Sequence, residues 1–537
     1  MPTLQATIQA IHKEFPAFSL DEKGKVSTMR ISAETLKPIV ALLIGKHWRL
    51  LTMAGNDERA QAGVFTVSWV FGLAKENKIM RLVLPVDPRK PVFPSIFELV
   101  QSALLFELEI RDMFGLTPEG NPDLSMPDEH REKMIRRLVH HHNWPEGEYP
   151  LRKDFPWNKR PKEEHVTFPF RYSEGEGVFE IPVGPIHAGV IEPGHFRFTA
   201  VGEMILNLEI RLYYSHRGVE KLFEQKSIPD AVALAEHISG DTSFGHSLAF
   251  CEALEELSGI SISRRAGFLR VIFLELERLY NHVGDIGMLG MDAGFAFGGA
   301  QGARLKEVCM QMNERLTGSR ILRGINVVGG VTRDISEKDS EMLGAFLDAF
   351  ASDFQEVTDI MLSSSSFLDR LETTGKLKTQ TALDYNVVGP VARASGLRRD
   401  ARKDFPNAWW KEFQFQISVQ ATGDVYARFM VRTEEVLQSI KIIKTALLRL
   451  PKGERVMATQ PIRLTEGACV VSIVEGWRGE LVHVVVAGKN NSLYRVKVRD
   501  ASFLNWPTLS RAILNNIVPD FPLCNKSYNM SYAGNDL

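Results

Sequence analysis

RRAGFLRVIFLELERLYNHVGDIGMLG, residues 264–290, is the stretch that decides the fold of the larger part of this chain. Its apolar residues return every three or four positions, a spacing that places them on one face of a helix. The same spacing recurs in three further segments, at 243–259, 341–371 and 425–450. Because amphipathic helices bury their apolar faces against one another, we expect residues 181–537 to form a mainly helical domain.

This helical domain is predicted to contain a minor sheet. Between residues 469 and 503, valine-rich runs are interrupted by the turn-forming residues Gly-Lys and Asn-Asn-Ser. Short β-branched runs separated by such residues are typical of β-hairpins. Towards the N-terminus, strand-like runs at 64–74 and 78–87 and a helix expected over 95–116 indicate a second, smaller α+β domain within residues 1–125.

Residues 126–180 differ from both domains, because they are rich in Pro, His, Lys and aromatic residues and show little periodicity. We expect an extended linker that wraps a partner, with a solvated histidine run at 140–142. The predicted fold class is therefore α+β, with a small domain at 1–125, the linker at 126–180, and a mainly helical domain at 181–537.

The composition excludes several classes of function. Lys+Arg 64 against Asp+Glu 66 leaves no basic surplus, so nucleic acid is not expected as a partner. The N-terminus lacks the apolar core of a signal peptide, and the most apolar stretch, at 62–74, is too short to span a bilayer. We therefore predict a cytoplasmic location, with any link to a membrane made through partners.

The cysteines point away from metal binding by this chain. Four of them lie far apart with no CxxC pair, whereas iron–sulfur clusters and structural zinc need closely spaced thiolates. We expect buried, free thiols at all four positions: Cys251, Cys309, Cys469 and Cys524.

Several strings carry a specific family resemblance. ELEIRDMFGLTPEGNPDL at 107–124 and YPLRKDFPW at 149–157 are similar to the 30-kDa-type subunit of complex I. A second group follows the order of the 49-kDa-type subunit: GPIHAGVIEPGHFRF at 184–198, HRGVEKLFE at 216–224, VVGPVARASGLRRDAR at 387–402, GDVYARFMVRTEEVLQSIKII at 423–443 and EGWRGE at 475–480. Together these motifs resemble the fused subunits of the complex I and group 4 membrane-bound NiFe hydrogenase superfamily, such as that of formate hydrogenlyase or hydrogenase-4.

The resemblance also predicts a lost nickel site. In those hydrogenases four thiolates from two CxxC motifs hold nickel, and hydroxyls do not replace thiolates on so soft a metal. Reading the early motif against HISGDTSFGH and the late motif against the C-terminal tail places other residues at all four ligand positions: Ser239, Thr242, Ser531 and Gly534. The printed sequence also ends at Leu537 without the extension that hydrogenase maturation removes. The resemblance therefore indicates a cysteine-less, hydrogenase-related branch with no metal and no cofactor bound by this chain.

In complex I the equivalent cavity holds a quinone head group. The resemblance implies that His195 contacts the quinone, backed by Asp292, because an imidazole titrates near operating pH and a carboxylate can replace its proton. A tyrosine used by complex I is replaced here by Gly240, and Tyr528 or Tyr532 in the tail is a candidate to supply a phenol instead.

Further residues take candidate roles from the same resemblance. Glu220 matches a glutamate that gates proton transfer, although pairing with Arg217 or another base is an equally open reading. Arg478 matches an arginine that overhangs the metal in hydrogenases, and here it lines the cavity or an interface. His187 either touches the same cavity or has a structural role.

Two functions from different classes follow. The first is a peripheral oxidoreductase subunit of NADH-quinone oxidoreductase or hydrogenase type, in which a quinone accepts electrons from iron–sulfur clusters on partner subunits. The partners implied are a small iron–sulfur subunit, a ferredoxin-like subunit and antiporter-like membrane subunits. The alternative is a non-redox adaptor that couples to those membrane transport proteins, which the loss of the tyrosine favours. An active NiFe hydrogenase is the least favoured reading because its ligands are missing.

Overall fold

The N-terminal part folds around a five-stranded sheet in the computed structural model, which describes residues 3–15, 18–123, 137–141, 143–164, 170, 175–189 and 191–537. The sheet has the order β1-β2-β5-β4-β3, and only β2 and β5 run parallel. The strands are β1 (Leu20–Lys23), β2 (Val26–Arg30), β3 (Arg49–Glu58), β4 (Val64–Leu73) and β5 (Lys78–Val86). The helices of this part are α1 (Leu4–Glu14), α2 (Ala33–Gly45), α3 (Arg59–Ala62) and α4 (Ala103–Phe114), and β6 (Val92–Pro94) pairs with β7 (Thr117–Glu119).

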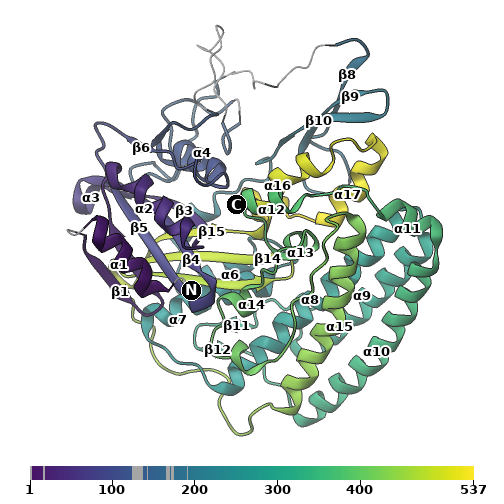
Figure 1. Cartoon of the computed structure of the whole chain (residues 1–537). Coiled ribbons are helices and arrows are strands. Elements are labelled where there is room, and N and C mark those ends of the chain that lie inside the picture. The colour runs from purple at the N-terminus through teal and green to yellow at the C-terminus, as the bar shows by residue number, and fades with distance from the viewer. Residues whose placement is uncertain are drawn as a thin grey trace.

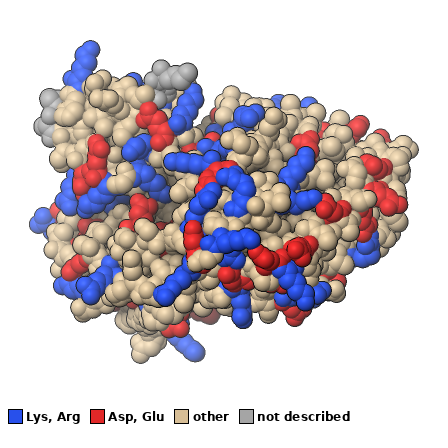
Figure 2. Space-filling view, turned by 90° about the horizontal axis from the view of Figure 1, so that it is seen from below, with Lys and Arg blue, Asp and Glu red and all other residues tan. Residues whose placement is uncertain are grey.

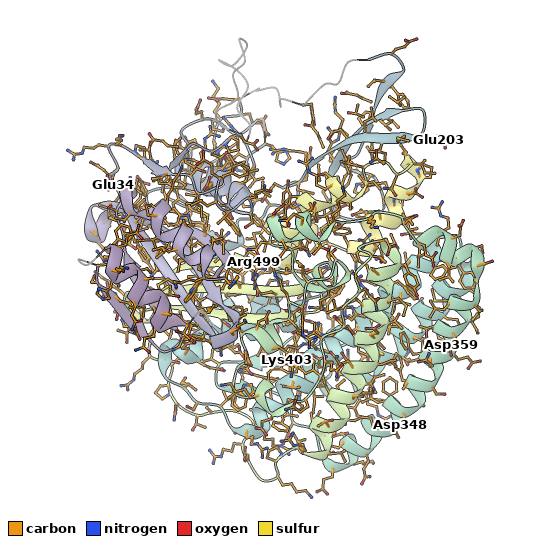
Figure 3. All side chains as sticks on the ribbon, in the orientation of Figure 1. Glu34, Glu203, Asp348, Asp359, Lys403 and Arg499 are labelled. Atoms are coloured by element: carbon orange, nitrogen blue, oxygen red, sulfur yellow. The ribbon has the colours of Figure 1, made fainter. Side chains whose placement is uncertain are left out.

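Four long helices form the body of the larger part, at the lower right of Figure 1. They are α8 (Arg264–Asp292), α9 (Ala296–Thr317), α10 (Glu337–Ser363) and α15 (Val425–Leu448). α8 packs against both α9 and α15 and is buried along most of its length, as its apolar repeat predicts. α10 covers the outside, where Asp348 and Asp359 are exposed (Figure 3).

The predicted minor sheet lies between this bundle and the N-terminal part (Figure 1). It consists of antiparallel strands β13 (Cys469–Gly476), β14 (Gly479–Ala487) and β15 (Leu493–Arg499), with α7 (Ser243–Ser258) packed on β13 and β14. Arg499 at the end of β15 donates to the Leu51 carbonyl of β3 at 3.1 Å, deep inside the molecule (Figure 3). This sheet therefore connects the two parts of the chain.

The C-terminal tail returns to the middle of the molecule. Its helices are α16 (Ala501–Ala512), α17 (Phe521–Tyr528) and α18 (Tyr532–Asp536), and the C-terminus lies centrally in Figure 1. Beside α16 and α17, a three-stranded sheet of order β10-β9-β8 projects from the body. Its strands are β8 (Val178–Val183), β9 (His195–Val201) and β10 (Met204–Arg211).

The remaining elements are short and connect these layers. They are α5 (Val219–Phe223), α6 (Ile228–Glu236), β11 (Asn326–Val327), β12 (Gly330–Val331), α11 (Ser365–Leu371), α12 (Thr379–Asp384), α13 (Gly389–Ala394) and α14 (Ala401–Asp404). Among the described residues, no helix is both long and apolar enough to cross a membrane. Acidic and basic side chains are interspersed on the face shown in Figure 2.

Three details differ from the sequence-based expectations. The helix predicted over 95–116 begins only at Ala103. The histidine run is not solvated throughout, because His140 is buried and its ring stacks on Trp144 at 4.6 Å, whereas His142 lies outside the described residues. All four cysteines are free, but Cys469 is only partly buried.

Candidate functional site

The tail, the loop before β9 and the loop before α7 meet at one place. Ser531 Oγ lies 2.9 Å from Ser239 Oγ, although the two residues are 292 positions apart. Tyr532 Oη lies 3.4 Å from His187 Nε2, and the amide of Ala533 donates to Glu192 at 2.8 Å. The structure therefore brings His187 and Tyr532 next to the predicted former ligand positions.

The side chains at those four positions are hydroxyls or absent. Thr242 Oγ1 accepts hydrogen bonds from Trp477 Nε1 and Arg478 Nη1, both at 3.1 Å. A side chain at Gly534 would meet Asp500, because its Cβ would lie 2.8 Å from Asp500 Cγ. The donor set offers no thiolate, so these residues do not fit a soft, redox-active nickel ion.

An ion pair between Arg478 and Asp241 lies on the solvent side of the former ligand positions. Arg478 donates through both terminal nitrogens to the carboxylate of Asp241, with Nη2 at 2.7 Å from Oδ2. Burial alone would raise the pKa of Asp241, but the guanidinium of Arg478 and the hydroxyls of Ser239 and Thr242 outweigh it and hold the pKa below its ordinary value. Asp241 is therefore ionised at neutral pH.

A chain of buried imidazoles lies beneath the tail. His246 Nε2 lies 3.0 Å from Asp500 Oδ2, and His246 Nδ1 lies 3.1 Å from His483 Nε2. A carboxylate oxygen only accepts, so His246 Nε2 carries a proton. Burial and the neighbouring His246 lower the pKa of His483 well below its ordinary value, and burial is the larger cause. His483 therefore stays neutral.

His195 begins β9 with its Nδ1 at 3.3 Å from the Gly184 carbonyl oxygen. Because a carbonyl can only accept, Nδ1 carries the proton and Nε2 offers a lone pair. Nε2 is buried and has no hydrogen-bond partner among the residues that the structure describes. Burial lowers the pKa of His195, so the ring is neutral near pH 7 and suited to accept a proton.

The expected support of His195 by Asp292 is not formed. Among the described residues, no hydrogen bond joins the two side chains, because His195 Nδ1 faces the Gly184 carbonyl and Nε2 has no partner. Asp292 ends α8, where burial raises the pKa of its carboxyl and Lys526 opposes that shift. The proton-transfer roles of both residues remain predictions.

Glu220 is held by two cations instead of pairing with Arg217. Its carboxylate lies 2.7 Å from Arg495 Nη2 and 3.2 Å from Lys497 Nζ, and accepts the Val498 amide at 2.9 Å. Burial would raise the pKa of Glu220, but Arg495 and Lys497 outweigh it and lower the pKa. A carboxyl that stays ionised is a poor proton gate, so the geometry favours the structural reading over the predicted gating role.

Tyr528 is placed differently from Tyr532. Its ring lies under Arg428, with the guanidinium carbon 4.6 Å from the ring centroid, and burial raises the pKa of its phenol. Tyr532 packs instead between Trp506 and His187, with ring centroids 4.9 and 6.0 Å away. Only Tyr532 of the two predicted tyrosines reaches the loop that precedes His195.

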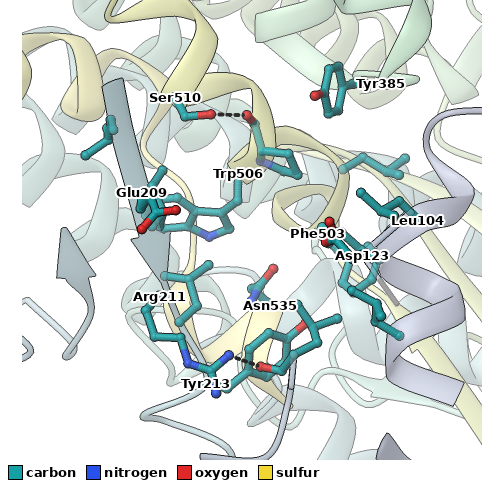
Figure 4. Close-up of a pocket in the computed structure, with 18 of the residues that line it drawn as sticks. Leu104, Asp123, Glu209, Arg211, Tyr213, Tyr385, Phe503, Trp506, Ser510 and Asn535 are labelled. Atoms are coloured by element: carbon teal, nitrogen blue, oxygen red, sulfur yellow. Dashed lines mark hydrogen bonds between the residues drawn. The ribbon is translucent and has the colours of Figure 1, made fainter. Parts of the chain in front are cut away.

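A cavity of about 270 Å³ lies next to this region, between α4, β10 and α16 (Figure 4). Its walls are largely apolar, with Leu104, Phe503 and Trp506 among the lining residues (Figure 4). Arg211 lines it from the end of β10, directly opposite His195 in the antiparallel register. Phe170, whose ring centroid is 5.4 Å from that of His195, lines it as well. His195 is therefore separated from this cavity by two of its lining residues, Arg211 and Phe170.

Comparison with known proteins explains this combination of elements. A family model of the 30 Kd subunit of respiratory-chain NADH dehydrogenase matches residues 29–161, and the model of its 49 Kd subunit matches residues 292–467 and 456–536. Formate hydrogenlyase subunit 5 of Escherichia coli (strain K12) is 33% identical over 543 residues, which cover 99% of this chain and 93% of the relative. The chain belongs to this family of fused 30-kDa/49-kDa-type subunits.

Other members of the family are oxidoreductase subunits. Hydrogenase-4 component G of the same bacterium is 32% identical over 544 residues, covering 99% of this chain and 92% of the relative. The C/D subunit of NADH-quinone oxidoreductase from Phocaeicola vulgatus is 28% identical over 499 residues, covering 89% of this chain and 93% of the relative. The predicted family and the α+β fold are thus confirmed, whereas the predicted domain boundaries remain predictions.

Family motifs alone did not single out three residues that build this site. Asp241 lies between two predicted former ligand positions, but no family motif assigns it a role. His483 lies within β14 and Asp500 directly follows β15, where period-2 patterns indicate burial but not polar pairing. The sequence signals that could have identified them are a charged residue at the end of a strand, Asp500, and a histidine inside a valine-rich run, His483.

Proposed function

We propose that this chain is a nickel-free oxidoreductase subunit of a membrane-bound complex, in which a quinone-type acceptor receives electrons from an iron–sulfur partner. The proposal rests on one observation above others: among the described residues, the buried Nε2 of His195 has no hydrogen-bond partner, and its neighbours Arg211 and Phe170 line a largely apolar cavity. The planar, conjugated ring of a quinone suits apolar walls, and a neutral imidazole nearby suits proton exchange with a quinone oxygen.

The absence of thiols at the former ligand positions supports the nickel-free part of the proposal. Ser239 and Ser531 donate or accept through hydroxyls, and Gly534 offers no side chain. The names of the relatives support the assembly, because they include subunits of a quinone oxidoreductase and of hydrogenases. By analogy the partners are a small iron–sulfur subunit, a ferredoxin-like subunit and antiporter-like membrane subunits, on the cytoplasmic face of the membrane.

The test uses the complex purified from membranes through this chain. Reduction of a short-chain quinone is measured for the unmodified complex and for His195→Ala, which we expect to lower turnover at least about 100-fold if the imidazole exchanges the proton. Tyr532→Phe is expected to lower turnover about fivefold through loss of one hydrogen bond, and Tyr528→Phe is its matched control with little effect. Equal turnover in the unmodified complex and His195→Ala would reject the assignment.

A non-redox adaptor is the second candidate, and two observations favour it. Among the described residues no hydrogen bond joins His195 to Asp292, and the Glu220 carboxylate is held by Arg495 and Lys497, so neither carboxylate is hydrogen-bonded to His195. Mass spectrometry of the purified complex separates the two functions. Recovery of membrane transport subunits without an iron–sulfur partner would support the adaptor and exclude electron transfer.

A further inference from the structure

The carboxylate of Asp241 occupies a site built for a carboxylate. Arg478 donates to both of its oxygens, and the hydroxyls of Ser239 and Thr242 donate to Oδ1 at 3.0 and 3.2 Å. Four donors from three side chains therefore converge on one planar O–C–O group. A guanidinium fork matches that group in two parallel hydrogen bonds, which is the strongest arrangement for carboxylate recognition.

The donors are held by contacts other than those to the Asp241 carboxylate, although Trp477 Nε1 also donates to the Asp241 carbonyl at 2.9 Å. Arg478 Nε donates to the Asn529 carbonyl at 2.5 Å, and the guanidinium carbon lies 3.9 Å from the centroid of the Trp477 ring. The hydroxyls of Ser239 and Ser531 are hydrogen-bonded to each other, and Thr242 Oγ1 accepts a hydrogen bond from Trp477 Nε1. The site formed by Ser239, Thr242 and Arg478, which we call the carboxylate cradle, thus keeps its shape if Asp241 leaves it.

Asp241 closes the cradle from the solvent side. Its side chain is 41% exposed, whereas that of Arg478 is 6% exposed and both hydroxyl residues are buried. The preceding Gly240 is exposed, and a Cβ there would approach only Arg323, at 3.6 Å. The carbonyl of Asp241 accepts from Asn281 Nδ2 at 2.8 Å and Trp477 Nε1 at 2.9 Å, so the backbone is held in place, and rotation of the half-exposed side chain towards solvent carries its carboxylate away from the donors.

We propose that the carboxylate cradle binds a small planar carboxylate anion, of the size of formate, acetate or bicarbonate, which displaces the side chain of Asp241. The anion makes two hydrogen bonds to Arg478 and one each to Ser239 and Thr242. Asp241 acts as a tethered competitor, which keeps the buried guanidinium paired when no anion is bound. Quinone reduction is not part of this inference, so binding is expected even in a chain that fails the test above.

Because Asp241 is covalently attached, it competes at an effective concentration in the millimolar range or higher. The free anion therefore binds the unmodified chain weakly, and removal of the competitor strengthens binding. We expect Asp241→Ala to bind at least about tenfold more tightly than the unmodified chain. Arg478→Gln in the Asp241→Ala background is expected to abolish that gain, and Thr242→Val is expected to reduce it.

The experiment measures binding of ¹³C-labelled formate, acetate and bicarbonate to the purified full-length chain by NMR line broadening, with chloride and sulfate as competing anions. The three probes separate the anions by size and by the extra oxygen of bicarbonate. Asp353→Ala is the matched control, because Asp353 also pairs with both terminal nitrogens of an arginine, Arg304, but the side chain of this arginine is 45% exposed, whereas that of Arg478 is 6% exposed. This control is expected to gain no affinity.

Binding to the unmodified chain that strengthens in Asp241→Ala and disappears without Arg478 supports the proposal. Thr242→Val covers the case in which Arg478→Gln fails to fold, since it removes one donor and leaves the guanidinium in place. The proposal is overturned if the unmodified chain binds none of the three anions, if Asp241→Ala binds no more tightly than the unmodified chain, or if Asp353→Ala gains as much as Asp241→Ala.

Discussion

At the scale of single residues, the buried side chains of Asp500, His246 and His483 near the tail form a continuous series of hydrogen bonds. Asp500 accepts from His246 at 3.0 Å and from the Ser502 amide at 2.7 Å, and His246 in turn contacts His483. Burial alone would raise the pKa of Asp500, but the bond to His246 and the charges of His246 and Arg478 lower it to about 2. Asp500 therefore stabilises the folded state as an ion.

Asp500→Asn tests this ion through the pH dependence of stability. The pKa of Asp500 is depressed below the unfolded value of about 3.9, so its contribution is present above pH 4 and is lost as the pH falls towards 2. At pH 7 the unfolding free energy of the variant is expected to be about 2–3 kcal/mol lower than that of the unmodified chain. This difference is expected to shrink as the pH falls from 4 to 2, because Asp500 becomes protonated in the unmodified chain. Denaturant titration across this range measures both effects.

The exposed Asp348→Asn provides the control, because the Asp348 side chain is 67% exposed and pairs with Lys444 at the surface. We expect it to change the unfolding free energy by less than about 0.5 kcal/mol. A loss at pH 7 in Asp500→Asn that is no greater than in this control would contradict the assignment.

The residues of the site could be predicted from the sequence only where a motif fixed their register. Ser239 and Ser531 were assigned to neighbouring positions by family motifs, and their hydroxyls lie 2.9 Å apart. Asp241 was not predicted, since its role depends on Arg478, which is 237 residues away. The contact between His195 and Asp292 was predicted but is not formed, because a motif gives position along the chain and not the direction of a side chain.

At the scale of elements, helices were predictable where the apolar period was long. The helix at 264–290 appears as α8, because its repeat is buried against two neighbours. The helix expected over 95–116 begins only at Ala103, because the Glu107 side chain forms hydrogen bonds with the residues before it. Its carboxylate accepts from Ser95 Oγ, the Ile96 amide and Asn121 at 2.7–2.8 Å, which holds residues 95–102 in a turn. Hydrophobic periodicity does not reveal hydrogen bonds made by a single polar side chain, so this helix start could not be predicted from the sequence.

The contact between α8 and α9 depends on two glycines. A Cβ at Gly302 would lie 2.4 Å from the Cα of Gly287, and a Cβ at Gly287 would lie 2.7 Å from the Cα of Gly302. Gly302→Ala must push the helices apart, and we expect it to lower the unfolding free energy by about 1–3 kcal/mol. Thermal or denaturant unfolding measures this change.

Gly344→Ala in α10 is the matched control, because a Cβ there meets nothing within 4 Å. We expect it to raise stability by up to about 1 kcal/mol, since alanine has the higher helix propensity. If both substitutions changed stability in the same direction and by the same amount, close packing of α8 on α9 would not be the cause.

At the scale of the whole molecule, buried ion pairs join the two parts of the chain. Lys497 on β15 lies 2.6 Å from Glu109 of α4 and 3.2 Å from Glu220, and Arg49 of β3 pairs with Glu480 of β14 at 2.5 Å. Burial raises the pKa of Glu109, an effect that Lys497 opposes. The partners in Lys497–Glu109 and Arg49–Glu480 are 388 and 431 residues apart, so local patterns could not predict these pairs, although the family resemblance predicted the two parts themselves.

Lys497→Met tests this junction. It leaves two buried carboxylates without a shared cation, and we expect a loss of about 3–5 kcal/mol of unfolding free energy. Limited proteolysis of the N-terminal part should accelerate in parallel. Lys452→Met, at an ion pair with 82% and 78% exposed side chains, is expected to change stability by less than about 1 kcal/mol. Equal effects of the two variants would show that the buried pair does not hold the parts together.

The nickel content of the complex, purified from membranes through this chain, tests the central claim most directly. Elemental analysis gives nickel and iron per copy of the chain in one measurement. We expect nickel far below one atom per chain, because the former ligand positions carry hydroxyls or no side chain: Ser239, Thr242, Ser531 and Gly534. Iron is expected from the clusters of the proposed partner subunits. About one nickel atom per chain would contradict the account and place metal chemistry at a site where we find none of the required thiolates.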